Sequence, residues 1–168
     1  VIEALESNQK DEDKHDLGFN YICNAHGTNA RAEREAESIL KAWLEAPEHP
    51  ILKAAILERS VFFVLLPFYR FVGDIGMRTL AADISRDEQT HVAIHGMVAH
   101  DLGLKNTKNL NNLRKQTVDW VMNGLNSSKN NKAAGILTAV FLSSASLNVL
   151  ASAGYSIFMS NKYPAISI

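Results

Sequence analysis

The chain has 168 residues, with 17 lysines and arginines against 18 aspartates and glutamates, so its formal net charge is −1. This near-neutral charge argues against a nucleic-acid partner, and 46% hydrophobic with 21% charged residues is ordinary for a globular protein. A single cysteine, Cys23, excludes an internal disulfide framework and favours a reducing, cytoplasmic location.

Hydrophobic periodicity predicts helices along the whole chain, and no segment alternates as a strand does. Glycines and prolines separate the helical segments, and Asp74 follows Gly73 as a predicted N-cap. We therefore expect an all-α fold of five or six helices in one domain, residues 1–168. The predicted helices span residues 1–23, 30–45, 51–72, 75–102, 107–125 and 131–160.

Three features of these segments bear on the architecture. The second half of 51–72 is almost entirely apolar, which predicts a central, buried helix that Pro67 kinks. The uncharged run 133–159 is long enough to cross a bilayer, but serines interrupt it, so a helix buried in a bundle is preferred to a membrane span. The first residues read as the middle of a helix and lack an initiator methionine, as in the ordered part or C-terminal portion of a longer chain.

Two Glu-x-x-His pairs stand out, Glu12 with His15 and Glu88 with His91. Residues three apart lie on one face of a helix, so each pair can direct a carboxylate and an imidazole at one metal ion. Glu58 lies just before the most apolar stretch of the chain, where a carboxylate is costly unless it is bound. Glu58 can equally begin its helix and face solvent, favoured by the helix dipole.

Carboxylates combined with imidazoles suit iron or manganese, whereas zinc more often takes thiolates or additional histidines. Helical bundles build two-metal sites from two Glu-x-x-His pairs and single carboxylates on the other helices. The five residues named above supply all but one carboxylate of such a set.

Three segments resemble the radical-generating small subunit of class I ribonucleotide reductase, a member of the ferritin-like di-metal carboxylate superfamily. ISRDEQTH at residues 84–91 is similar to its signature, and LERSVFF at 57–63 to the helix bearing its single glutamate. DEDKHDLGFNYI at 11–22 resembles its first Glu-x-x-His helix. Motif order and type agree in all three segments.

The resemblance implies a ferritin-like bundle that holds two metal ions, Fe/Fe or Mn/Fe. It implies as ligands Glu12, His15, Glu58, Glu88 and His91. Asp87 matches the family's aspartate that orients a ligand histidine and lies on the radical-transfer route. The implied partners are a second copy of the chain and a large catalytic subunit that makes deoxyribonucleotides, with no nucleic acid or membrane involved.

The chain departs from the family pattern in three respects. Phe19 stands at the position of the radical tyrosine, and Tyr21 lies on a different helical face. Family members with phenylalanine there store the oxidising equivalent on a manganese–iron centre. The first carboxylate ligand, expected on a preceding helix, has no counterpart before Glu12. The His15-to-Glu58 connection is short, and no tail for docking on the large subunit is evident after Ile168.

Other interpretations of the same residues stay open. The chain can be an oxidase or oxygenase acting on a small or fatty substrate, or a non-catalytic metal-binding bundle. His95 lies one turn beyond His91 on the same face. It can support a metal ligand by a hydrogen bond, or simply be a buried, hydrogen-bonded histidine. Without the resemblance, Asp87 is most simply a solvated helix charge and Phe19 a core residue.

Overall fold

The computed structural model describes the backbone of residues 2–127 and the side chains of residues 3–124. Within residues 2–127 every regular element is an α-helix, so the described part of the chain is an all-α bundle. The predicted helix 131–160 and the segment 133–159 lie outside the described residues. The helices are α1 (Ile2–His26), α2 (Ala30–Glu45), α3 (Pro50–Val72), α4 (Ile75–Asp101) and α5 (Lys108–Ser127).

The helix ends follow local signals in the sequence. The side chain of Asn29 accepts hydrogen bonds from the backbone at the start of α2, and Asp74 Oδ1 accepts one from Met77 N at the start of α4. Pro50 occupies the first turn of α3, where its missing N–H costs nothing. Gly103, with φ of 65°, follows α4 in the left-handed conformation that glycine tolerates best.

The predicted bounds of α2 are confirmed, and those of α3, α4 and α5 differ by one or two residues. The predicted end of the first helix at residue 23 is wrong, because α1 continues to His26. Gly27, with φ of 83°, ends the helix instead, and its backbone N–H still bonds to Cys23 O. α3 continues through Pro67, so the proline does not end it.

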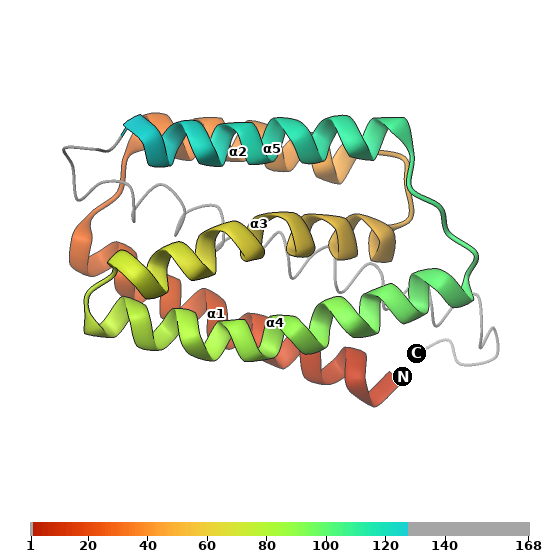
Figure 1. Cartoon of the computed structure of the whole chain (residues 1–168), viewed down its shortest axis with the longest axis horizontal. Helices are drawn as coiled ribbons and strands as arrows, with labels where there is room; N and C mark the ends of the chain where they lie inside the picture. Colours follow the sequence, from red (N-terminus) through yellow and green to blue (C-terminus); the bar gives the residue numbers. More distant parts are fainter. Residues whose placement is uncertain (1, 128–168) are drawn as a thin grey trace.

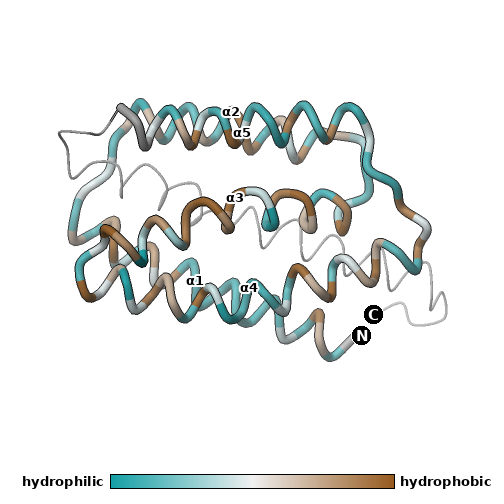
Figure 2. The backbone as a smooth tube through the Cα atoms, viewed as in Figure 1, coloured by the Kyte–Doolittle hydropathy of each residue, from teal (hydrophilic) through white to brown (hydrophobic). Residues whose placement is uncertain are grey.

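The helices lie in layers, with α3 between the α2–α5 pair and the α1–α4 pair (Figure 1). Successive helices run in alternating directions through short connections, as in an up-and-down bundle. α3 packs most extensively against α4 and also contacts α5, while α1 packs mainly against α4. This arrangement explains why α3 is the most uniformly hydrophobic helix (Figure 2), since neighbours cover it on two sides.

The main core lies between α3 and the helices around it. Trp43 of α2 is fully buried, and its Nε1 donates a 2.9 Å hydrogen bond to Thr117 Oγ1 of α5. Leu65 of α3 and Leu110 of α5 are fully buried in the same cluster. None of the helices in residues 2–127 combines the length and hydrophobicity that crossing a membrane requires.

The turn between α2 and α3 is held by a buried lysine. Lys53 Nζ donates hydrogen bonds to Leu44 O at 3.0 Å and to Ala46 O at 2.9 Å. These carbonyls at the end of α2 have no partner within their own helix, so the ammonium group satisfies them and ties α2 to α3.

Candidate metal centre

α1 directs a polar stripe into the bundle instead of a hydrophobic one. Asn8, Glu12 and His15 are all buried, and their spacing of three and four residues places them on one face of the helix. Phe19 continues the stripe one turn further on and is 1% exposed. The same helix leaves Tyr21 67% exposed, so Tyr21 lies on the opposite side from this stripe.

α4 presents a matching stripe toward α1. Glu88, His91 and His95 follow at intervals of three and four residues and are all buried, with no exposed surface at His91. The aliphatic side chains of Ile84 and Val98 occupy the same buried face on either side of them. α4 therefore holds three polar groups inside a helix whose buried face is otherwise hydrophobic.

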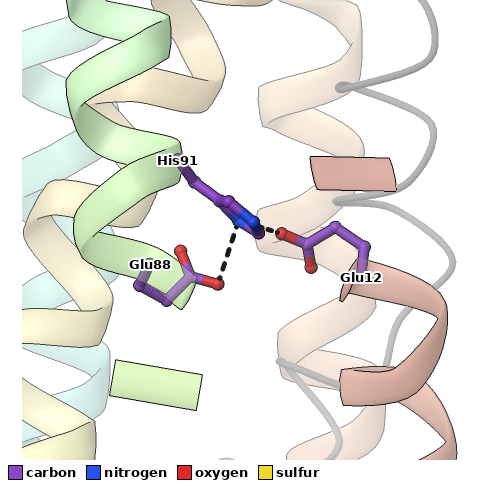
Figure 3. A group of neighbouring side chains, drawn as sticks. All are labelled: Glu12, Glu88 and His91. Carbon is purple, nitrogen blue, oxygen red and sulfur yellow. Dashed lines mark hydrogen bonds and ion pairs between the residues drawn. The ribbon is translucent and has the colours of Figure 1, made fainter. Parts of the chain in front are cut away.

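The two stripes meet at Glu12, Glu88 and His91, whose side chains converge between α1 and α4 (Figure 3). His91 Nδ1 lies 3.0 Å from Glu12 Oε1 and 3.5 Å from Glu88 Oε1. One ligand atom from each residue lies within 4.8 Å of the other two, which is compact enough for all three to contact one ion.

His15 joins this cluster from the α1 side. Its Nδ1 is 3.4 Å from Glu88 Oε1 and 3.6 Å from Glu12 Oε2. Its other nitrogen, Nε2, is 3.0 Å from Asp87 Oδ2, which fixes the orientation of the ring. Because Asp87 is partly exposed, the His15–Asp87 contact connects the buried cluster to the protein surface.

Glu58 of α3 is buried rather than solvent-facing, so the solvent alternative is wrong. Its Oε2 lies 2.9 Å from His95 Nδ1, and the two side chains are 2% and 1% exposed. This pair lies between α3 and α4, one turn along α4 from His91. Glu58 thus contacts His95, for which the sequence left two interpretations open.

The charges in the site are strongly coupled. Burial opposes a charged imidazole, but contacts with Glu12 and Glu88 outweigh it and raise the pKa of His15 to about 10 and that of His91 to about 11. Burial would also raise the pKa of Glu12, yet the two histidines lower it to about 2. Without a metal the site therefore holds charged imidazoles against carboxylates.

Glu58 behaves in the opposite way. Burial raises the pKa of Glu58 to about 7, and His95 only partly opposes this effect. Burial also opposes the charge on His95, whereas Glu58 raises the pKa of that histidine. Burial therefore favours the neutral form of Glu58, whereas the contact with Glu58 favours the charged form of His95.

Several buried polar atoms of the site have no hydrogen-bond partner among the described residues. They are both carboxylate oxygens of Glu88, Nδ1 of His15, Nε2 of His91 and Nε2 of His95. Three of these atoms still form ion pairs, because Glu88 Oε1 lies 3.4 Å from His15 Nδ1 and His91 Nε2 lies 3.5 Å from Asp11 Oδ2. Leaving such atoms bare is costly, and a cation bound to the carboxylate oxygens and imidazole nitrogens would satisfy them. The residues present consequently fit a metal, with oxygen and nitrogen donors of the kind that iron and manganese accept.

The structure brings together four of the five expected ligands, Glu12, His15, Glu88 and His91, with Asp87 beside His15. The fifth, Glu58, contacts His95 instead.

Two buried groups of the site were not among the expected ligands. Asn8 precedes Glu12 by one turn and is buried with an unpartnered Nδ2, and His95 contacts Glu58. In the sequence, Asn8 lies four residues from Glu12 and His95 lies four residues from His91. This spacing predicts a shared helix face, but it does not distinguish a metal ligand from a core residue.

Comparison of the chain with family models, with curated proteins and with solved structures gave no match.

Proposed function

We propose that the chain is a di-metal helical-bundle oxidoreductase, of the kind formed by the small subunit of ribonucleotide reductase in the cytoplasm. One observation carries the proposal: two Glu-x-x-His pairs on different helices converge on one buried cluster that contains unpartnered ligand atoms. Among the described residues neither Glu88 oxygen has a hydrogen bond, although Glu88 Oε1 forms ion pairs with His15 and His91. A bound cation would satisfy both oxygens.

Each residue has a defined part in this proposal. Glu12, Glu88 and His91 hold metal between α1 and α4, and His15 adds a second imidazole. Glu58 brings a carboxylate from α3. The bound pair, Fe/Fe or Mn/Fe, supplies one-electron oxidising chemistry with dioxygen as the oxidant.

Asp87 accepts a hydrogen bond from His15 Nε2, and this leaves His15 Nδ1 available for metal. In the proposed function Asp87 also begins the route by which the oxidising equivalent reaches the large subunit. Phe19 has no hydroxyl group, so it cannot form a tyrosyl radical, and exposed Tyr21 is remote from the buried face. A bound Mn/Fe pair would supply the oxidising equivalent without a tyrosyl radical at the position of Phe19, as in the family members with phenylalanine there.

Metal analysis and electron paramagnetic resonance (EPR) test the proposal. Protein loaded with iron, or with manganese and iron, should bind about two ions per chain. Exposure to dioxygen should give a metal-centred signal and no tyrosyl signal. Glu88→Ala should lose metal, whereas Glu37→Ala, which removes an exposed carboxylate from α2, should bind metal like the parent.

The outcomes separate the alternatives. Absence of bound iron and manganese in the parent, with Glu88→Ala unchanged, would rule out a catalytic metal centre. Metal binding without an oxidant-dependent signal would indicate a non-catalytic metal-binding bundle. An oxidised centre that consumes a small or fatty substrate, and does not support ribonucleotide reduction with a large subunit, would indicate an oxidase or oxygenase.

A further inference from the structure

We propose that His95 is itself a metal ligand, which supplies from α4 the donor that the other five residues lack. This inference rests on the metal centre proposed above. It makes the site one of three carboxylates, from Glu12, Glu58 and Glu88, and three imidazoles.

The burial of His95 is the first support. The residue is 1% exposed, and its Nε2 has no hydrogen-bond partner among the described residues. A neutral imidazole has one donor and one acceptor nitrogen, and a buried nitrogen left bare costs free energy. A histidine serving only as core would be expected to satisfy both nitrogens or be replaced by a hydrophobic residue.

The second support is that His95 repeats the arrangement of His15. In each ring one nitrogen contacts a carboxylate, at 3.0 Å for His15 with Asp87 and at 2.9 Å for His95 with Glu58. In each ring the other nitrogen is buried and makes no hydrogen bond with the described residues, although His15 Nδ1 lies 3.4 Å from Glu88 Oε1. Histidines that bind metals characteristically donate their second N–H to a carboxylate in this way, which fixes the ring and its tautomer.

The third support is position. The ring centroids of His91 and His95 are 6.5 Å apart, and those of His15 and His91 are 5.9 Å apart. His91 therefore stands between two further imidazoles, and His95 extends the ligand face of α4 by one turn toward Glu58. A donor here lies at the α3 side of the site, where Glu58 otherwise stands apart from the Glu12–Glu88–His91 group.

The substitution of an imidazole for a carboxylate has a chemical consequence. An uncharged donor leaves the centre with one negative charge fewer than a site of four carboxylates. Imidazole also suits iron better than manganese, which prefers oxygen donors. In a mixed Mn/Fe pair the ion bound by His95 should therefore be the iron, whereas Mn(II) supplied alone should occupy both positions.

A different role for His95 would be to orient Glu58 without touching metal. The variants His95→Ala and His95→Gln distinguish the two roles, because glutamine can still donate a hydrogen bond to Glu58 but offers no imidazole nitrogen. His100→Ala is the matched control, since it removes a histidine from the exposed end of the same helix.

The experiment measures Mn(II) binding to the full chain and its variants by loss of the free-ion EPR signal. Nitrogen couplings to the bound ion are counted by pulsed EPR. We expect both His95 variants to bind one of the two ions about 100-fold more weakly or worse and to lose imidazole nitrogen coupling, with His100→Ala unchanged. A crystal structure of the Mn(II)-loaded parent should place His95 Nε2 within about 2.3 Å of an ion.

Each other result has a definite meaning. Parent-like binding by His95→Gln would show that His95 only orients Glu58, and parent-like binding by His95→Ala would show no role; either overturns the proposal. If a variant fails to fold, judged by its helical circular dichroism, the loaded parent structure decides by the distance from Nε2 to the ion. A parent that binds no metal at all would instead refute the proposed function.

Discussion

The bundle contains two interior regions that differ in how many of their buried polar atoms have hydrogen-bond partners. Between α2, α3 and α5 the core is mainly hydrocarbon, and its buried polar side chains have partners. Trp43 donates to Thr117, which in turn donates to Leu113 O. Lys53 donates to two carbonyls at the end of α2. Between α1, α3 and α4 the interior is built from carboxylates and imidazoles with bare ligand atoms. Among the described residues the buried polar side chains of the first region have their partners, whereas the second region leaves carboxylate and imidazole atoms without hydrogen bonds, which a bound cation would satisfy.

The largest expected effect concerns the hydrocarbon interior. Trp43→Ala removes a fully buried indole and leaves Thr117 without that partner, so the free energy of unfolding should fall by about 3–5 kcal/mol. Urea denaturation measures this loss, with and without metal. The loss should be equal in both conditions, and a strong dependence on metal would show that the two interiors are not independent. Trp43→Phe, which keeps most of the hydrocarbon, should lose less.

Metal loading should stabilise the polar region between α1, α3 and α4 and leave the packing of the hydrocarbon core between α2, α3 and α5 unchanged. At free metal of 100 to 1,000 times the dissociation constant, the gain in unfolding free energy is about 2.7–4.1 kcal/mol. Thermal unfolding with and without a chelator measures it. Glu88→Ala should abolish the gain, whereas Glu37→Ala should retain it. Equal stabilisation of both variants would place the metal somewhere other than this cluster.

The pH dependence of the unfolding free energy should differ between the metal-free and metal-loaded forms. Because contacts with Glu12 and Glu88 overcome burial and raise the pKa of His15 to about 10 and of His91 to about 11, the folded metal-free protein holds more protons than the unfolded chain above pH 6.5 or so. Its unfolding free energy should therefore fall as pH rises from 7 to 10. Metal replaces those protons, so metal affinity should rise over the same interval.

Urea denaturation at several pH values in a chelating buffer checks the first trend, and metal titration checks the second. The double variant His15→Gln, His91→Gln should lose most of both. A metal-free stability that rises from pH 7 to 10 would contradict the charged imidazoles inferred for the polar interior.

The smallest effect is expected on the outer face of α4. Arg86 forms an exposed ion pair with Asp83 at 2.9 Å, only two residues from buried Glu88. Arg86→Ala should change the unfolding free energy by less than about 0.5 kcal/mol and leave metal binding unaltered. A larger effect on metal binding would mean that the outer face of α4 contributes to the site, which would weaken the contrast between buried and exposed charges.

Much of this could be predicted from particular residues. Asp74, Pro50 and Gly103 place helix ends because their backbone effects are local. Spacing alone identified the two Glu-x-x-His pairs, since three residues on a helix fix a shared face whatever surrounds it. The end of α1 was misplaced because Asn24 to His26 carry no breaker, and Gly27 is the first residue that needs a positive φ.

What the sequence could not provide was the packing of one helix on another. Whether Glu58 faced solvent or the interior depended on which side of α3 meets α4, and a nearly all-apolar helix does not reveal this. The contact between Glu58 and His95 joins residues 37 positions apart, so no local sequence pattern predicts it. The His15–Asp87 contact, across 72 positions, was expected only from the family resemblance.

The attachment of α1 has a consequence for how the chain folds and opens. α3 and α4 form an antiparallel hairpin through a short turn, so their contacts cost little loop entropy, whereas α1 reaches α4 across more than seventy residues of chain. We therefore expect α1 to pack against the bundle after α3 and α4, and a metal bound to both α1 and α4 to hold α1 in place. Backbone amides of α1 should exchange with deuterium faster in chelator than in metal, while those of α3 keep their protection.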